Sequence, residues 1–202
     1  MIQDQLLKIK NREFTIGILG LGYVGLPLMW TFHNAGMPVI GYDIDKNKVE
    51  NIKNGVSYIK HLGTEMMKTL ASSNKVDATT DFQRLNEADA VLLCVPTPLN
   101  IHREPDMSYV EKTTETVSKH LCAGQIVILE STTWPGTSEE LMIPILERNS
   151  GLKADKDFYV AYSAEREDPG NANFNTAKIP KVVGGHGEEA LKLAVAMYDT
   201  AI

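Results

Sequence analysis

Three glycines, Gly20, Gly22 and Gly25, have the spacing G-x-G-x-x-G and follow an apolar run that begins at Phe14. A segment with helical apolar spacing comes directly after them, so the pattern is that of a strand, a glycine turn and a helix. The first glycine permits the tight bend, the second lets a pyrophosphate approach the backbone, and the third allows the helix to pack closely on the strand. Backbone N–H groups at the start of the helix would face the phosphates of a dinucleotide. The pattern predicts a cofactor-binding segment made of Gly20, Leu21, Gly22, Tyr23, Val24 and Gly25.

A second apolar run, Val39 to Asp43, ends in an acid 18 residues after Gly25. A carboxylate at this place accepts hydrogen bonds from the adenosine ribose, and its charge repels the 2′-phosphate of the phosphorylated cofactor. Asp43 therefore favours NAD over NADP. The alternative is a glycine turn that only packs an ordinary α/β sheet, with Asp43 merely ending a strand.

The bulk composition excludes several classes of protein. The 202 residues are 43% hydrophobic and 23% charged, and their net charge of −6 makes nucleic acid and anionic membranes poor partners. Residues 1–13 lack the long apolar core of a signal peptide or membrane span. Cys94 and Cys122 give neither a disulfide framework nor a metal-ligand spacing, and the five histidines are scattered. We therefore expect no metal site and a cytoplasmic protein.

Six or more strand patterns alternate with helix patterns, which predicts an α/β, Rossmann-type fold with a doubly wound parallel sheet. The strongest strand pattern, Ala88 to Val95, is continuously apolar from Ala90 onward, as expected for a central strand covered on both faces. We expect one NAD-binding domain over residues 14–202, after a lead-in of residues 1–13. The last expected strand is Lys181 to Val183.

Helix boundaries are indicated by capping and breaking residues. Gly36 suits the end of the first helix, near Ala35. The pairs Ser108 with Glu111 and Thr137 with Glu140 have the spacing of capping boxes. Pro144 should kink the helix that the second box opens.

Six segments, taken in order along the chain, form a recognisable sequence pattern. They are GLGYVGLP (20–27), GYDID (41–45) with Lys48, CVPTP (94–98), ESTTWPGT (130–137), SAEREDPGN (163–171) and KVVGG (181–185). Together they resemble the amino-terminal domain of the UDP-glucose/GDP-mannose dehydrogenases, and the fourth and fifth look closest to the UDP-N-acetylglucosamine 6-dehydrogenases. One departure is Ala164, where many members have proline before the glutamate.

The resemblance implies a two-step, four-electron oxidation of the C6 alcohol of a UDP-sugar, with UDP-N-acetylglucosamine as the expected substrate and two NAD as oxidants. It implies that Asp43 holds the adenosine ribose, that Lys48 lies nearby and that Thr97 touches the cofactor. It places Thr132 and Glu165 at the reaction centre, and Glu165, Arg166 and Glu167 in the loop that holds the sugar nucleotide.

The chemistry of these side chains is compatible with those roles. A carboxylate such as Glu165 can act as a general base or orient a water, and the Thr132 hydroxyl can hold that water or the nicotinamide amide. Each residue also has a structural alternative. Thr132 could cap a helix or shape a turn, Glu165 could belong to a solvated charge cluster, Lys48 could be an exposed helix lysine, and Arg166 could pair with a neighbouring acid.

The cysteines are expected to be structural. Cys94 lies in a buried strand pattern, where a cysteine behaves as a small hydrophobe. In the family the catalytic cysteine belongs to a later domain, and a catalytic lysine and asparagine lie on the long helix that follows this one. We expect those central and carboxyl-terminal substrate domains to be absent here, this fragment to be inactive alone, and a homodimer only in the full-length protein. Two other hypotheses are a small β-hydroxyacid-type dehydrogenase and a non-catalytic NAD-binding regulatory module.

Overall fold

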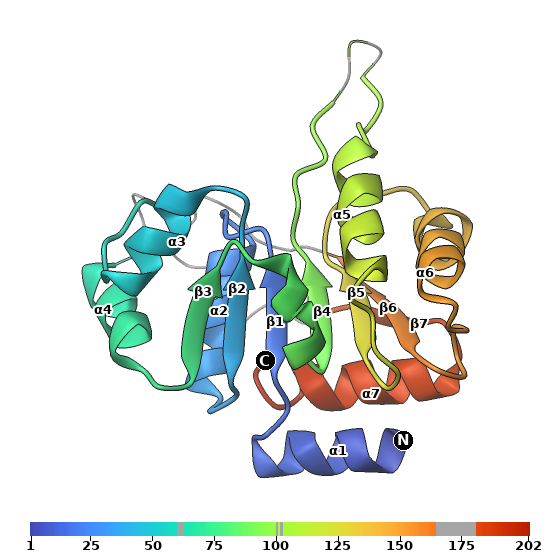
Figure 1. Ribbon diagram of the computed structural model, residues 1–202, viewed down its shortest axis with the longest axis horizontal. Coiled ribbons are helices and arrows are strands. Elements are labelled where there is room, and N and C mark those ends of the chain that lie inside the picture. The colour runs from blue at the N-terminus through green and yellow to red at the C-terminus, as the bar shows by residue number, and fades with distance from the viewer. Residues whose placement is uncertain (60–62, 100, 102, 165–180) are drawn as a thin grey trace.

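The computed structural model describes residues 1–59, 63–99, 101, 103–164 and 181–202. Within these ranges the strands form one sheet in the order β3-β2-β1-β4-β5-β6-β7 (Figure 1). The strands are β1 (Ile16–Leu19), β2 (Val39–Tyr42), β3 (Val76–Thr79), β4 (Ala90–Leu93), β5 (Ile126–Leu129), β6 (Tyr159–Ser163) and β7 (Val183–Gly185). Strands β1 to β6 pair in parallel, which confirms the predicted Rossmann-type doubly wound sheet.

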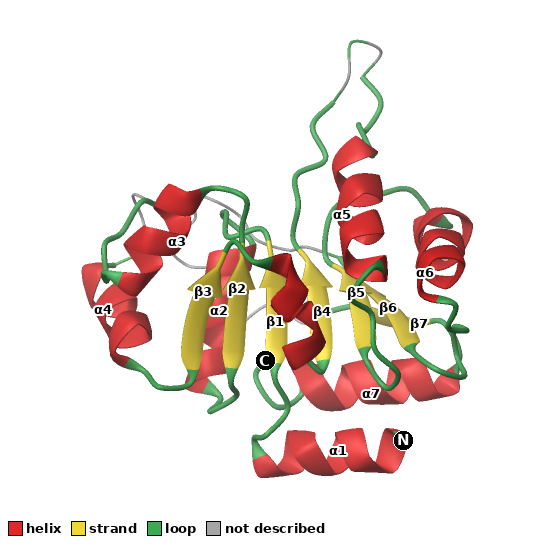
Figure 2. Ribbon diagram, viewed as in Figure 1, coloured by secondary structure: helices red, strands yellow, loops and turns green. Residues whose placement is uncertain are grey.

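Helices cover both faces of this sheet (Figure 2). They are α1 (Ile2–Asn11), α2 (Gly25–Asn34), α3 (Lys46–Lys53), α4 (Thr64–Ser72), α5 (Ser108–Ser118), α6 (Ile143–Ser150) and α7 (Glu188–Tyr198), with a 3₁₀ turn η1 (Phe82–Glu87) and a π-helical turn η2 (Ser138–Met142). The core on one face includes residues of α2 and α7, and the core on the other includes residues of α5 and α6. None of the helices in the described ranges has the length and apolar character needed to cross a membrane.

The two cores follow from the alternation of side chains along each strand. In β4, Ala90 and Leu92 belong to one core, whereas Val91 and Leu93 belong to the other. All four are completely buried, which explains why this strand is apolar without interruption. Burying a side chain such as Leu92 stabilises the fold by about 1.5–3 kcal/mol.

The strand order creates a crevice between β1 and β4. From β1 the chain winds outward to β2 and β3, and then crosses back to β4 on the other side of β1. The segments that follow β1 and β4 therefore diverge, and open α/β sheets bind ligands at such a switch point.

The last strand differs from the prediction in two ways. β7 begins at Val183 rather than Lys181, and it pairs with β6 in the antiparallel sense, with Ser163 opposite Val183. Lys181 lies before the strand and takes part in a buried charge cluster. The sheet is therefore mixed at this edge.

Both predicted capping boxes are wrong. At α5 the Glu111 N–H donates to the Met107 carbonyl (2.9 Å) rather than to the Ser108 hydroxyl, and the Asp106 carboxylate accepts a hydrogen bond from the Ser108 N–H (3.0 Å). That bond lowers the pKa of Asp106. The Thr137 hydroxyl donates backward to the Trp134 carbonyl (2.8 Å), and η2 follows directly. Pro144 stands just after this wide turn, in the first turn of α6, where its missing N–H is tolerated.

The lead-in is a regular helix, α1, which packs along α7 at the end of the sheet where the strands begin (Figure 1). Gln5 donates a hydrogen bond to the Gly124 carbonyl (2.9 Å), and Lys8 forms an ion pair with Asp89 (2.6 Å). The predicted end of the first long helix is confirmed, because Ala35 is the C-cap of α2 and Gly36 has a positive φ of 83°.

Candidate functional site

The three glycines of the turn differ in what a side chain would meet. Gly20 has a φ of 95°, and a Cβ there would lie 2.6 Å from the Cys94 carbonyl oxygen. A Cβ on Gly25 would lie 1.9 Å from the carbonyl oxygen of Gly20, so the first turn of α2 can approach β1 only without a side chain. A Cβ on Gly22 would meet nothing within 4 Å. Gly22 is therefore the glycine whose missing side chain leaves space for a ligand.

A cavity of about 630 Å³ opens beside this turn, at the switch point between β1 and β4. Its walls come from the glycine turn, the end of β2, the connection after α3, η1, the segment after β4, and the first turns of α5. The residues that carry the argument below are Gly20, Gly22, Asp43, Lys48, Tyr58 and Cys94. A volume of this size suits a cofactor rather than a small ion.

Asp43 lies at the end of β2 and is 5% exposed. Its Oδ2 accepts hydrogen bonds from the Leu21 N–H (2.8 Å) and from Lys48 Nζ (2.9 Å), and its Oδ1 accepts one from the Asp45 N–H (2.9 Å). A carboxylate offers about four acceptor positions, so one remains for a ribose hydroxyl. Asp43 thus fixes the glycine turn and also faces the cavity.

Some of the predicted cofactor residues line this cavity and others do not. Gly20, Gly22, Tyr23, Val24, Asp43 and Lys48 line it. Leu21 is completely buried, and Thr97 is partly buried one residue beyond the lining residue Pro96. Cys94 is buried as expected, but it follows β4 and also lines the cavity.

The reaction-centre residues lie partly outside the described ranges. Glu165, Arg166 and Glu167 fall within residues 165–180, which are not described. Thr132 is exposed and does not line this cavity, so its role stays a prediction.

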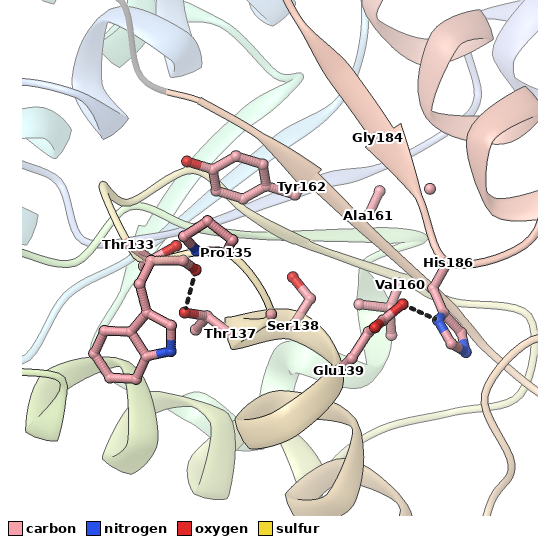
Figure 3. A pocket seen from close by; sticks show the side chains of 13 residues that line it. Thr133, Pro135, Thr137, Ser138, Glu139, Val160, Ala161, Tyr162, Gly184 and His186 are labelled. Atoms are coloured by element: carbon pink, nitrogen blue, oxygen red, sulfur yellow. Dashed lines mark hydrogen bonds and ion pairs between the residues drawn. The ribbon is translucent and has the colours of Figure 1, made fainter.

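A second cavity, of about 530 Å³, lies between the Thr133–Glu139 segment and the strands β6 and β7 (Figure 3). Thr133, not Thr132, belongs to its wall. Across it, His186 Nδ1 and Glu139 Oε1 are 3.3 Å apart.

Sequence reasoning missed several residues of the first cavity. Tyr58, Ile59, Phe82 and Tyr109 line it, although none directly follows a strand. Their only signal in the sequence is an apolar side chain in or next to a connection that leaves the carboxyl edge of the sheet. Among the described residues, no group of three or more His, Cys, Asp or Glu side chains is placed to hold a metal ion.

A buried charge cluster lies at the same edge of the sheet, beyond β5 and β6. Lys181 Nζ donates to Glu130 Oε2 (2.6 Å) and to Ser163 Oγ (3.0 Å), and the side chains of Lys181 and Glu130 are 7% and 0% exposed. The Tyr198 hydroxyl of α7 donates to Glu130 Oε1, and the Lys181 ammonium lies 5.0 Å from the centre of the Tyr198 ring. Burial and the negative charge of Glu130 hold the pKa of Tyr198 well above its ordinary value.

Residues 14–202 match the family model of the UDP-glucose/GDP-mannose dehydrogenase family, NAD binding domain. The chain is 36% identical over 190 residues to the UDP-N-acetyl-D-glucosamine 6-dehydrogenase of Salmonella typhi, covering 94% of this chain and 44% of that protein. It is 37% identical over 184 residues to the UDP-N-acetyl-D-mannosamine dehydrogenase of Pyrococcus horikoshii, covering 91% of this chain and 44% of that protein.

Among solved structures, the NDP-N-acetyl-D-galactosaminuronic acid dehydrogenase of Methanosarcina mazei Go1 superposes with a TM-score of 0.87 at 35% identity. The match covers 98% of this chain and 45% of that one. The chain thus spans less than half the length of these relatives.

The two glycines at the start of α2 should respond differently to alanine. Gly25→Ala should lower the free energy of unfolding by about 1–3 kcal/mol, because the methyl group collides with the Gly20 carbonyl. Gly22→Ala should keep the thermal midpoint and weaken NAD binding at least about tenfold, because its methyl group takes the space of the pyrophosphate. Urea unfolding and calorimetry measure the two effects; equal NAD affinity for Gly22→Ala and wild type would show that the pyrophosphate lies elsewhere.

Replacing Lys181 should be costly, because it leaves the Glu130 carboxylate buried without its cation. We expect Lys181→Met to lower the free energy of unfolding by about 3–5 kcal/mol, measured by urea unfolding. The matched control is Lys68→Met, which breaks the exposed pair with Glu65 and should leave the midpoint unchanged. Equal midpoints for the two variants would contradict the importance of the buried cluster.

Proposed function

Because the chain belongs to the UDP-glucose/GDP-mannose dehydrogenase family, we propose that it supplies the NAD-binding part of a UDP-hexosamine 6-dehydrogenase. The observation that carries this proposal is the cavity beside the glycine turn, with Gly22 and Asp43 in its wall, within residues 14–202 that match the family. In this proposal the pyrophosphate of NAD lies against Gly22 and the adenosine ribose bonds to Asp43.

The expected substrate is UDP-N-acetylglucosamine or a closely related UDP-hexosamine. Oxidation of the C6 alcohol to a carboxylate removes four electrons, as two hydrides, and adds one water, so each sugar consumes two NAD. NAD, when bound, accepts the hydrides. By their names, the relatives from Salmonella typhi and Pyrococcus horikoshii act on UDP-N-acetyl-D-glucosamine and UDP-N-acetyl-D-mannosamine, and the choice between these hexosamines is part of the proposal.

Thr132 and Glu165 are the residues of this chain that we propose for the reaction. Thr132 comes two residues after the completely buried Glu130, and Glu165 comes two residues after the completely buried Ser163. Glu165 is proposed to take the proton from the alcohol and to orient the water, and Thr132 to hold that water by its hydroxyl. Glu165, Arg166 and Glu167 are further proposed to contact the sugar nucleotide.

The choice of NAD over NADP should depend on the charge of Asp43. We expect wild type to bind NAD at least about tenfold more tightly than NADP, since the 2′-phosphate would be forced against a carboxylate. Asp43→Asn should weaken the binding of NAD and make the affinities for NAD and NADP similar. The reason is that Lys48 then faces the 2′-phosphate without a competing anion. Calorimetric titration with both cofactors measures this.

The matched control for Asp43→Asn is Asp45→Ala. Asp45 accepts the hydrogen bond that caps α3, from the Asn47 N–H (2.9 Å), so its loss should affect stability but not cofactor choice. If Asp43→Asn keeps the wild-type ratio of NAD to NADP affinity, Asp43 does not select the cofactor.

The 202-residue chain should bind NAD without oxidising a UDP-sugar by itself. The family resemblance implies a cysteine nucleophile in another segment, and Cys94 is only 8% exposed. We expect no NADH absorbance when chain, NAD and UDP-N-acetylglucosamine are mixed, while calorimetry of the same sample reports NAD binding. UDP-sugar-dependent NADH production, kept in a Cys94→Ala variant and lost in Glu165→Gln, would contradict this and assign the whole reaction to the chain.

A further inference from the structure

Tyr58 contacts the glycine turn although it lies far from the G-x-G-x-x-G motif in the sequence. It lies between α3 and α4, and its hydroxyl donates a hydrogen bond to the carbonyl oxygen of Leu21 (2.8 Å). Tyr58 also belongs to the wall of the cavity, together with Ile59, Asp43 and Lys48. Tyr58 therefore touches the turn and the ligand space at once.

The two peptide groups beside Leu21 are each held by a specific partner. The Leu21 N–H donates to Asp43 Oδ2 (2.8 Å), and the Leu21 carbonyl accepts from Tyr58. The Leu21 side chain is completely buried against β2, where a Cβ on Gly41 would lie only 2.7 Å from its Cδ2. The residue is thus fixed by its side chain, its N–H and its carbonyl.

The direction of the Leu21 carbonyl determines the direction of the next N–H group. In a planar trans peptide the C=O and the following N–H point in opposite directions, so the bond from Tyr58 also sets the orientation of the Gly22 N–H. Gly22 is the glycine of the turn on which a Cβ would meet no atom within 4 Å, and it belongs to the cavity wall. Without the hydroxyl, the Leu21–Gly22 peptide could rotate, because glycine tolerates many backbone conformations.

We propose that Tyr58 is a positioning residue for the pyrophosphate of NAD: its hydroxyl holds the Leu21–Gly22 peptide so that the Gly22 N–H is oriented before the cofactor arrives. The inference rests on the NAD binding of this domain. Burial, followed by the negative charges of Asp43 and Asp45, raises the pKa of Tyr58 far above the ordinary value for tyrosine, so the hydroxyl stays a donor at neutral pH. Preorganised donors bind more tightly because less ordering remains for the binding step.

The test is Tyr58→Phe, which keeps the ring in the cavity wall and removes only the donor. We expect about five- to tenfold weaker binding of NAD and of ADP by calorimetry, the loss typical of one hydrogen bond. Binding of adenosine, which has no phosphate, should stay within about twofold of wild type by NMR titration. In the same variant the ¹H–¹⁵N resonance of Gly22 should shift.

The matched control is Tyr159→Phe, which removes a tyrosine hydroxyl bonded to Glu189 (3.1 Å), a residue of α7 outside the cavity wall. It should leave the affinities for NAD, ADP and adenosine unchanged, even where it lowers the thermal midpoint. If Tyr159→Phe lowers the thermal midpoint without changing these affinities, a general loss of stability does not explain weaker binding in Tyr58→Phe.

Two outcomes overturn the proposal while NAD binding by wild type is retained. Equal loss of adenosine and ADP affinity in Tyr58→Phe would make Tyr58 a wall for the nucleoside only. Unchanged affinity for all three ligands would make its hydroxyl irrelevant to binding. If wild type itself fails to bind NAD, the cofactor site assigned above fails, whichever result Tyr58→Phe gives.

Discussion

The cofactor site depends on one steric constraint, the close approach of two stretches of backbone at Gly20 and Gly25. Any side chain on Gly25 would overlap the Gly20 carbonyl oxygen, so α2 begins directly above the carboxyl end of β1. The positive end of the helix dipole therefore lies where the strand ends. Because the strand order reverses between β1 and β4, the same place is also the one where the chain leaves a crevice. The steric constraint and the strand order together place the turn, the helix dipole and the cavity at the same point.

The wall of the cavity around Asp43 is held by hydrogen bonds within the protein. Asp43 already bonds to two backbone N–H groups and to the Lys48 ammonium, and the turn is fixed at Leu21. These bonds satisfy a carboxylate that would otherwise be buried at a cost of several kcal/mol. If Asp43 selects the cofactor as proposed, cofactor choice and stability are coupled at this residue.

The sequence predicted the features that depend on neighbours in the chain, and failed where distant residues meet. Apolar runs such as Ala90 to Val95 predicted the strands, because burial on both faces leaves no polar positions. The direction of β7 could not be read from its three residues, and the cap of α5 comes from Asp106, whose short side chain reaches the helix from outside the expected box. The bond from Tyr58 to Leu21 joins residues 37 positions apart, and no spacing rule covers that distance.

The two halves of the carboxyl edge are organised by different physics. Around β1 and β2 the backbone itself is packed tightly, whereas beyond β5 and β6 a buried cation and anion hold the ends of the strands together. A buried ion pair adds little net stability, because the loss of hydration offsets the attraction between the charges. Its directional bonds do fix positions, and Glu130 and Ser163 each stand two residues before a residue proposed for the reaction. We therefore interpret the Lys181 cluster as the element that fixes Glu130, after β5, relative to Ser163, at the end of β6, with Tyr198 linking Glu130 to α7.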